Sequence, residues 1–199
     1  MLILDEQNIL AQGHFRKVYS HPLDDDLLVK VLKPVKHSKR FLSRFNLSCA
    51  RYGRMTTAFR EYEEYISAVA RLDRLPTPLP LFHGFVETNL GVAMVVEKIK
   101  GADGEVALNI HEYIERHGFT EDLGAMIDAL EETVKAEHII CSDLKCENVV
   151  ISSRGLVVVD GTSDKVFFSI NRYSKTLFLR WCARKFDRLR AAARSYETA

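Results

Sequence analysis

Residues 141–148 of the chain read C-S-D-L-K-C-E-N. Apolar runs precede and follow it, so a polar loop between two buried segments is predicted. Ser, Gly or Pro would be enough for an ordinary loop. Asp143, Lys145 and Asn148 instead provide a carboxylate, an ammonium and an amide at fixed offsets, a combination that suits a metal-bound phosphate.

The composition is that of a globular chain. Its 199 residues are 47% apolar and 28% charged, which is enough for one large domain or two small lobes. The net charge of +1 argues against a general nucleic-acid or membrane binder, and no nucleic-acid partner is expected. The first residues carry acids where a signal peptide would be basic, and no run reaches the roughly 18 apolar residues of a membrane span. We therefore expect a cytoplasmic protein.

The cysteines are too few and too scattered for a disulfide framework, and their spacing does not match a zinc knuckle. We expect reduced thiols at all four positions, which are Cys49, Cys141, Cys146 and Cys182.

Hydrophobic periodicity and turn signals predict mainly strands in the first half of the chain. A β-hairpin and a third strand are expected within residues 9–33, and a helix over Ala58–Leu75, stopped by P-T-P-L-P. Two more strands are expected at residues 81–87 and 92–99.

The second half of the chain has mainly helical patterns. Helices are predicted over Ile110–His117 and Thr120–Ala136, the second with Thr120 as its N-cap, and over Ser174–Arg194. Two short strands, residues 149–152 and 156–159, flank the turn S-S-R-G.

Five strands with one helix, followed by a mainly helical half, is the order of elements in a protein kinase, and the motifs resemble that family. C-S-D-L-K-C-E-N matches five of the eight positions of the kinase catalytic loop H-R-D-L-K-P-E-N. V-V-V-D-G at residues 157–161 resembles the strand that ends in D-F-G, and L-L-V-K-V-L-K at 27–33 resembles the third strand with its phosphate-pairing Lys. M-V-V-E-K-I-K-G at 94–101 is similar to the hinge between lobes.

The resemblance covers the whole chain and implies a fold class. The expected fold is α+β, a reduced two-lobed kinase-like fold in a single domain, residues 1–199. Residues 1–97 would form an N-lobe with a five-stranded antiparallel sheet and one helix, and residues 98–199 a minimal helical C-lobe.

Within that superfamily the chain resembles the small bacterial proteins called YrbL, which are associated with the PhoP regulatory network. The resemblance lies in four segments: Q-G-H-F-R-K-V-Y-S-H-P from residue 12, F-R-E-Y-E-E-Y from 59, F-H-G-F-V-E-T-N-L-G from 82 and W-C-A-R-K-F from 181.

The kinase resemblance implies roles for the polar loop, because phosphoryl transfer needs positioning and charge neutralisation more than covalent chemistry. Asp143 would be the catalytic carboxylate that orients an attacking hydroxyl, and Lys145 would offset charge on the γ-phosphate of ATP. Asn148 and Asp160 would be the oxygen ligands of Mg²⁺.

The same resemblance implies a binding site for ATP. Lys30 would reach the α- and β-phosphates and be held by Glu61, with Glu64 as the reserve partner. The remaining nucleotide-binding residues implied are Gly13 and Val18 near the phosphate-covering loop, Val96 as gatekeeper, and Glu97 and Ile99 at the adenine edge.

Three departures from the kinase pattern bear on activity. The loop G-x-G-x-x-G reads A-Q-G-H-F-R at residues 11–16, and Arg16 in it is interpreted either as a cationic clamp or as a solvent-exposed side chain. Cys141-Ser142 replaces His-Arg, so control by activation-loop phosphorylation is not expected. D-F-G reads Asp160-Gly161-Thr162, without the Phe that switches this segment in kinases.

The length of chain after Asp160 and two basic stretches bear on partners. Because 39 residues follow Asp160, we expect a small, sugar or lipid-linked acceptor, or a protein bound by other surfaces. The basic stretches 33–54 and 172–194 suit an anionic membrane surface or a phosphorylated sugar, or else form solvated faces. The first alternative would place the protein at the inner face of the membrane.

These observations favour an ATP- and Mg²⁺-dependent phosphotransferase that acts on an unidentified hydroxyl acceptor: protein Ser or Thr, sugar or lipid-linked. The alternative is a nucleotide-binding pseudokinase that works as a regulatory interaction module. A third class, antibiotic or small-molecule phosphotransferases, shares the D-x-x-x-x-N spacing but usually has H-x-D and a larger helical lobe.

Overall fold

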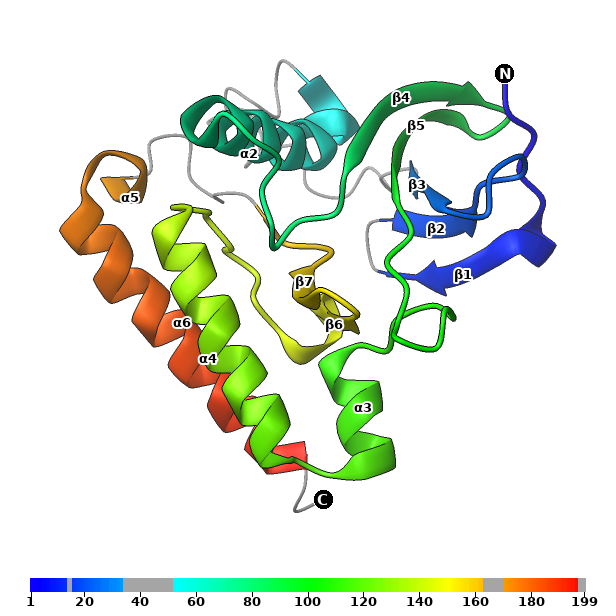
Figure 1. Cartoon of the computed structure of the whole chain (residues 1–199). Helices are drawn as coiled ribbons and strands as arrows, with labels where there is room; N and C mark the ends of the chain where they lie inside the picture. The colour runs from blue at the N-terminus through cyan, green and yellow to red at the C-terminus, as the bar shows by residue number, and fades with distance from the viewer. Residues whose placement is uncertain (14–15, 34–51, 163–169, 197–199) are drawn as a thin grey trace, which may run out of the picture. The chain divides into compact units, whose positions relative to one another are not determined.

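A five-stranded antiparallel sheet dominates the first part of the computed structural model, which describes residues 1–13, 16–33, 52–162 and 170–196 (Figure 1). The strand order is β1-β2-β3-β5-β4. The strands are β1 (Ile9–Gln12), β2 (Arg16–Ser20), β3 (Leu27–Leu32), β4 (Phe82–Thr88) and β5 (Gly91–Glu97). The described residues of this half also form two 3-10 turns, η1 (Glu6–Asn8) and η3 (Gly53–Met55), and helix α2 (Thr56–Leu72).

The chain forms two compact units. The first unit consists of Met1–Tyr62 and Leu81–Lys98, and the second of Glu63–Pro80 and Ile99–Ala199. Helix α2 therefore contributes its first residues to one unit and its remaining residues to the other.

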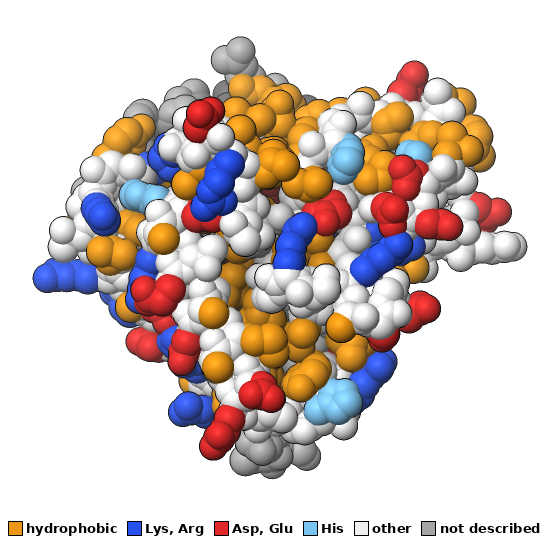
Figure 2. Space-filling view, in the orientation of Figure 1, with side chains coloured by type: hydrophobic (Ala, Val, Ile, Leu, Met, Phe, Trp, Pro, Cys, Tyr) orange, Lys and Arg blue, Asp and Glu red, His pale blue; other side chains and the backbone are white. Residues whose placement is uncertain are grey.

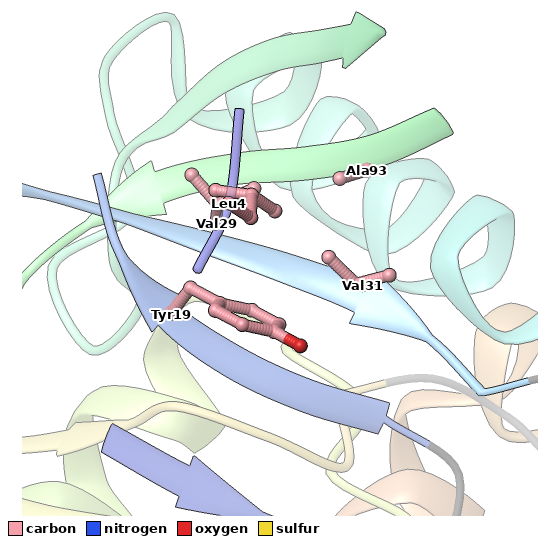
Figure 3. Close-up of a cluster of buried hydrophobic side chains, with 5 residues drawn as sticks. All are labelled: Leu4, Tyr19, Val29, Val31 and Ala93. Carbon is pink, nitrogen blue, oxygen red and sulfur yellow. The ribbon is translucent and has the colours of Figure 1, made fainter. Parts of the chain in front are cut away.

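Alternation along β3 gives the sheet two buried faces. Val29 and Val31 lie opposite Tyr19 and Ala93 in the neighbouring strands, and with Leu4 they form the cluster drawn in Figure 3. Because side chains alternate across a strand, the neighbouring positions of β3 face the other side. That second face holds a cluster of Leu32, Met94, Val96 and Ala58, the last of which comes from α2.

Helix α2 begins two residues earlier and ends three residues earlier than predicted. Asp73 follows the helix with a φ of 52°, in the left-handed region that interrupts an α-helix, and its N–H bonds the carbonyl of Val69. The expectation that the helix continues to Leu75 is therefore wrong, since the backbone turns before the P-T-P-L-P run is reached.

The second unit is built mainly from helices. Its elements are α3 (Ile110–His117), α4 (Glu121–Ala136), η4 (Cys146–Asn148), the hairpin β6 (Val149–Ser152) and β7 (Gly155–Val158), α5 (Ile170–Tyr173) and α6 (Lys175–Ser195). Side-chain caps define the helix starts: Thr120 accepts the N–H of Leu123, and Asn109 forms a capping box with Glu112.

Helices α4 and α6 lie side by side and bury complementary stripes (Figure 1). The buried residues of α4 are Leu123, Ile127, Leu130, Glu131 and Val134, and those of α6 are Phe178, Cys182, Phe186, Leu189 and Ala193. Both stripes follow the spacing of one helix face, so the pair supplies much of the core of this unit.

Arg190 of α6 adds a polar link to α4. Its guanidinium donates to Asp128 at 2.6 Å and also bonds Glu131.

Figure 2 shows basic and acidic side chains interspersed on the visible surface, with no single gathering of Lys and Arg on that face.

The predicted fold class is confirmed: in the described residues an antiparallel sheet of five strands, accompanied by α2, precedes a mainly helical part. Several boundaries differ, since the strand expected at residues 92–99 ends at Glu97 and the one expected at 156–159 is Gly155–Val158. The short helix α5 was not predicted. The division of a single domain into lobes at residues 97 and 98 stays a prediction.

Replacing Phe186 with Ala is expected to destabilise the protein strongly. Its side chain is 1% exposed in the stripe facing α4, and removing a buried aromatic ring costs about 3–5 kcal/mol of unfolding free energy. Leu177→Ala on the same helix is the matched control, because Leu177 is 38% exposed. Urea unfolding of both variants checks this, and equal losses for the two would contradict the packing described.

Candidate active site

The predicted catalytic residues of the polar loop lie together in the second unit. The ammonium of Lys145 is 2.9 Å from Oδ2 of Asp143. The side-chain amide of Asn148 donates to the backbone carbonyl of Asp143 at 2.8 Å and to Oδ2 at 3.4 Å. The hydrogen bond from Lys145 to Asp143 raises the pKa of Lys145, so the lysine keeps its charge at neutral pH. A carboxylate, a cation and a neutral amide are thus held in one loop.

Alternation of buried and outward residues explains how the loop holds this arrangement. Leu144 and Cys146 are 8% and 1% exposed, whereas the side chains of Asp143 and Lys145 are 34% and 57% exposed. The turn η4 then closes with a bond from the N–H of Asn148 to the carbonyl of Lys145 at 3.0 Å. The apolar residues anchor the loop, and the polar residues between them point away from the core.

The Asp160-Gly161 segment lies directly against this loop. The N–H of Asp143 donates to the carbonyl of Gly161 at 3.2 Å, and Cys141 forms a β-bridge with Thr162. Gly161 has a φ of 79°, and a Cβ built on it would lie 2.7 Å from Cβ of Asp143. Only glycine fits a positive φ at such a short separation. The glycine of the D-G pair therefore allows the segment with Asp160 to lie against the polar loop.

The oxygen atoms of this region fit the predicted Mg²⁺ site. The amide nitrogen of Asn148 is turned toward Asp143, which leaves its oxygen available as a ligand. Asp160 adds a carboxylate whose Oδ1 accepts the N–H of Gly161 at 2.6 Å. No group of three or more Asp, Glu, His or Cys side chains suited to a metal occurs in the described residues. Mg²⁺ commonly binds through one or two protein ligands plus phosphate and water, so this sparse donor set is compatible with it.

The described cysteines are buried and unpaired, as predicted for Cys141, Cys146 and Cys182. Burial raises the pKa of Cys146 to about 11 and that of Cys182 to about 12, and it raises the pKa of Cys141 as well. Protonated thiols are poor nucleophiles and poor metal ligands. Although two of them lie in the polar loop, these cysteines contribute packing rather than thiolate chemistry.

In the first unit, Lys30 occupies the centre of the sheet. It lies in β3 opposite Val18 of β2 and Met94 of β5, and it is 8% exposed. Residues two apart in a strand share a face, so Lys30 lies on the same face as Leu32, against which α2 packs. The position predicted to bind phosphate is thus a buried lysine.

Glu61 of α2 binds Arg16 in the first unit. The guanidinium makes two parallel bonds, Nη2 to Oε1 at 2.6 Å and Nη1 to Oε2 at 2.9 Å, and both residues are buried, at 6% and 7% exposure. The interpretation of Arg16 as solvent-exposed is therefore wrong. Glu61 is the carboxylate predicted to hold Lys30, and its bidentate arginine partner was missed because the two residues are 45 positions apart.

Contacts within the chain define the positions of the remaining residues predicted to bind a nucleotide. The N–H of Gly13 donates to the carbonyl of Arg16 at 2.9 Å, and Val96 is buried in β5. Glu97 ends β5, where its carboxylate accepts the N–H of Leu81 at 2.9 Å. Ile99 lies in the core of the second unit with Val150 and Val157. Their contact with a nucleotide stays a prediction.

The two basic stretches are only partly described. Most of residues 33–54 lie outside the described residues. In the second stretch several cations have intramolecular partners, since Arg172 binds Glu63 at 2.8 Å and Arg190 binds Asp128. Arg180, Arg184 and Arg188 are exposed along one side of α6. No helix of the described residues is long and apolar enough to cross a bilayer.

A family model described as PhoP regulatory network protein YrbL matches residues 2–194. The chain belongs to this family. A relative from Escherichia coli K12, named uncharacterized protein YrbL, is 26% identical over 201 residues, which is 95% of this chain and 84% of the relative. The protein of the same name from Shigella flexneri has the same identity and coverage. The predicted resemblance to the YrbL family is thereby confirmed.

Solved structures similar to this YrbL family member include kinase domains. The PknI kinase domain of Mycobacterium tuberculosis has a TM-score of 0.49 and 15% identity, and the match covers 79% of this chain. A mutant of the same domain has a TM-score of 0.46 and 16% identity, over 77% of this chain. The chain spans 57% of the length of each of these kinase domains.

Gly161→Ala is expected to be more damaging than the same change at Gly104. Both glycines have a similar φ, 79° and 82°, but a Cβ at Gly104 would meet no atom within 4 Å. The control therefore measures the cost of the backbone conformation, about 1–2 kcal/mol, and Gly161→Ala should lose about 1–3 kcal/mol more from overlap with Asp143. Chemical denaturation gives both values. Equal losses would show that the contact with Asp143 is unimportant.

Arg16→Met is expected to destabilise the first unit by about 3–5 kcal/mol, because Glu61 would stay buried without its bidentate partner. Adding Glu61→Gln to Arg16→Met should recover part of that loss. Lys17→Met is the matched control, since the ammonium of Lys17 binds the exposed carboxylate of Glu6, and it should have a much smaller effect. A double-mutant cycle by urea unfolding measures the coupling, and additive losses would argue against it.

Proposed function

We propose that this YrbL family member is an ATP- and Mg²⁺-dependent phosphotransferase with an alcohol group as acceptor. The observation that carries the proposal is the contact of two segments in the second unit: the loop with Asp143, Lys145 and Asn148, and the Asp160-Gly161 pair. This juxtaposition supports the motif resemblance, because it brings together in space residues that the kinase pattern separates in sequence.

In this proposal Asp143 acts on the acceptor. Its carboxylate accepts a hydrogen bond from the attacking hydroxyl and aligns the hydroxyl oxygen with the γ-phosphorus. A bond forms between that oxygen and phosphorus while the bond to the bridging oxygen breaks, so ADP leaves and the hydroxyl proton passes to Asp143. The amide of Asn148, which bonds the carbonyl of Asp143, keeps the carboxylate in place.

The charge of ATP is handled by cations of the chain. Lys145, held 2.9 Å from Asp143, offsets charge on the phosphoryl group in transit. Lys30 binds the α- and β-phosphates, with Glu61 and Arg16 as the buried ion pair on the same unit. Asn148 and Asp160 would hold Mg²⁺, which when bound would neutralise charge on the phosphate oxygens.

The acceptor is proposed to be a protein Ser or Thr, a sugar or a lipid-linked alcohol. Arg180, Arg184 and Arg188 are exposed cations that would attract an anionic membrane surface or a phosphorylated sugar. In this proposal the protein is cytoplasmic and associates with the inner face of the membrane, where it could bind either anionic lipids or a phosphorylated sugar.

A nucleotide-binding pseudokinase is the second candidate, and one observation favours it. Arg16 replaces a glycine of the phosphate-covering loop and binds Glu61 with both of its terminal nitrogens. Glycines let the backbone of such a loop close over phosphates, and an arginine at this position lacks that backbone freedom. Its guanidinium is also bound to Glu61. A regulatory role through binding partners would then replace turnover.

Asp143→Asn is expected to lower ATP turnover by about a hundredfold or more. ATP and Mg²⁺ should still raise the melting temperature of this variant. Turnover and thermal unfolding are measured on the same samples of the parent chain and the variant. Glu147→Gln is the matched control, since Glu147 lies exposed on the same loop, and it should retain activity. A thermal shift without turnover in the parent chain would favour the pseudokinase, and no shift would remove both candidates.

A further inference from the structure

The backbone just before Asp143 is bound from one side by a buried carboxylate of α2. Oε1 of Glu64 accepts the N–H of Ile140 at 3.0 Å, across 76 positions of sequence, and Glu64 is 2% exposed. Burial raises the pKa of the Glu64 carboxyl. Nη2 of Arg172 lies 4.0 Å from Oε2 of Glu64, and Nη1 of the same arginine lies closer to Oε1 of Glu63, at 2.8 Å.

A buried carboxylate at this point is not explained by stability alone. Removing a carboxylate from water costs several kcal/mol, and an apolar residue of similar volume would commonly serve the core as well. What an apolar residue cannot do is accept the N–H of Ile140, an amide that lies in a fully buried pair with Ile139. A charged acceptor also gives a stronger hydrogen bond than a neutral one.

From another element, α6, Lys185 binds the same stretch of backbone. Its ammonium donates to the carbonyl of Ser142 at 2.5 Å. Cys182 and Phe186 on the same helix are each 1% exposed, so the helix surface that carries Lys185 is anchored by its neighbours. The ammonium also lies 5.5 Å from the ring of Trp181. The carbonyl of Ser142 and the ring of Trp181 therefore both restrict the orientation of the Lys185 side chain.

Together these contacts bind both ends of the segment that leads to the catalytic carboxylate. Glu64 holds the amide of Ile140 and Lys185 holds the carbonyl of Ser142, and the amide of Asp143 itself bonds Gly161. All six residues that supply or receive these bonds belong to the second unit. A rotation of the peptides at residues 140–142 would move Asp143, and small displacements of a catalytic group can lower a rate by about a hundredfold.

We propose that Glu64 and Lys185 are positioning residues that fix the backbone before Asp143, so that its carboxylate faces the acceptor hydroxyl. The catalytic part of this inference rests on the proposed phosphotransferase function. The positional part does not, because the backbone contacts exist whether or not the protein turns over ATP.

The first test is amide exchange at Ile140 in Glu64 variants, followed by NMR. Glu64→Ala removes the acceptor and should lower the protection of the Ile140 amide at least tenfold, whereas Glu64→Gln keeps a side-chain oxygen and should restore it to within about twofold. Glu63→Ala is the matched control, since Glu63 is the exposed neighbour that binds Arg172. Unchanged protection of Ile140 in Glu64→Ala would overturn the proposal.

The second test uses Lys185, which leaves α2 untouched. Lys185→Met keeps the apolar stem and removes the donor, and it should lower the protection of the Asp143 amide at least fivefold. Arg184→Met is the control, because Arg184 is the exposed neighbour on the same helix. Equal effects of Lys185→Met and Arg184→Met on Asp143 would overturn the role of Lys185.

Kinetics separate the inference from the proposed function. If the parent chain turns over ATP, Glu64→Ala and Lys185→Met should each lower kcat at least tenfold with less than a twofold change in KM for ATP, and Glu64→Gln should recover most of kcat. A larger effect on KM than on kcat would contradict positioning of the catalytic carboxylate. If the parent chain shows no turnover, the proposed function fails, while the exchange measurements still decide whether these residues hold the loop.

Discussion

The site in the second unit depends on one close approach, that of Gly161 to Asp143. The N–H of Asp143 donates to the carbonyl of Gly161 at 3.2 Å, and a side chain at Gly161 would overlap Asp143. This contact joins the end of the β6-β7 hairpin to the polar loop, so Asp160 and Asn148 come from segments that are tied together. Without it the oxygen atoms that suit a cation would have no fixed relation to the carboxylate of Asp143.

Both units contain buried charged groups. Arg16 and Glu61 satisfy each other through two hydrogen bonds, whereas Glu64 relies on a backbone N–H and a more distant arginine. Such groups rarely add stability compared with a packed apolar side chain. Their value lies in direction, since a carboxylate or guanidinium bonds along fixed lines and an apolar contact does not. The apolar stripes of α4 and α6 supply the compensating stability.

Local patterns explain why much of the fold could be predicted from the sequence. Hydrophobic period and cap residues define α3 and α4, and the short offsets within the polar loop bring Asp143, Lys145 and Asn148 into contact. What failed depends on tertiary context. The end of α2 is set by the left-handed backbone of Asp73, and the burial of Arg16 by a carboxylate 45 positions away. Neither leaves a periodic signal in the residues around it.

Helix α6 shows how one register can serve two purposes. Its buried stripe runs through Cys182 and Phe186, and Lys185 lies between them in sequence at the edge of that stripe. The rotation that packs the stripe against α4 therefore also directs the ammonium of Lys185 toward the carbonyl of Ser142. A shift of the helix by one residue would turn the stripe by about 100° and remove both interactions at once. Packing of the core and placement of the polar loop are thus one constraint on the sequence of α6, which accounts for a lysine beside so apolar a surface.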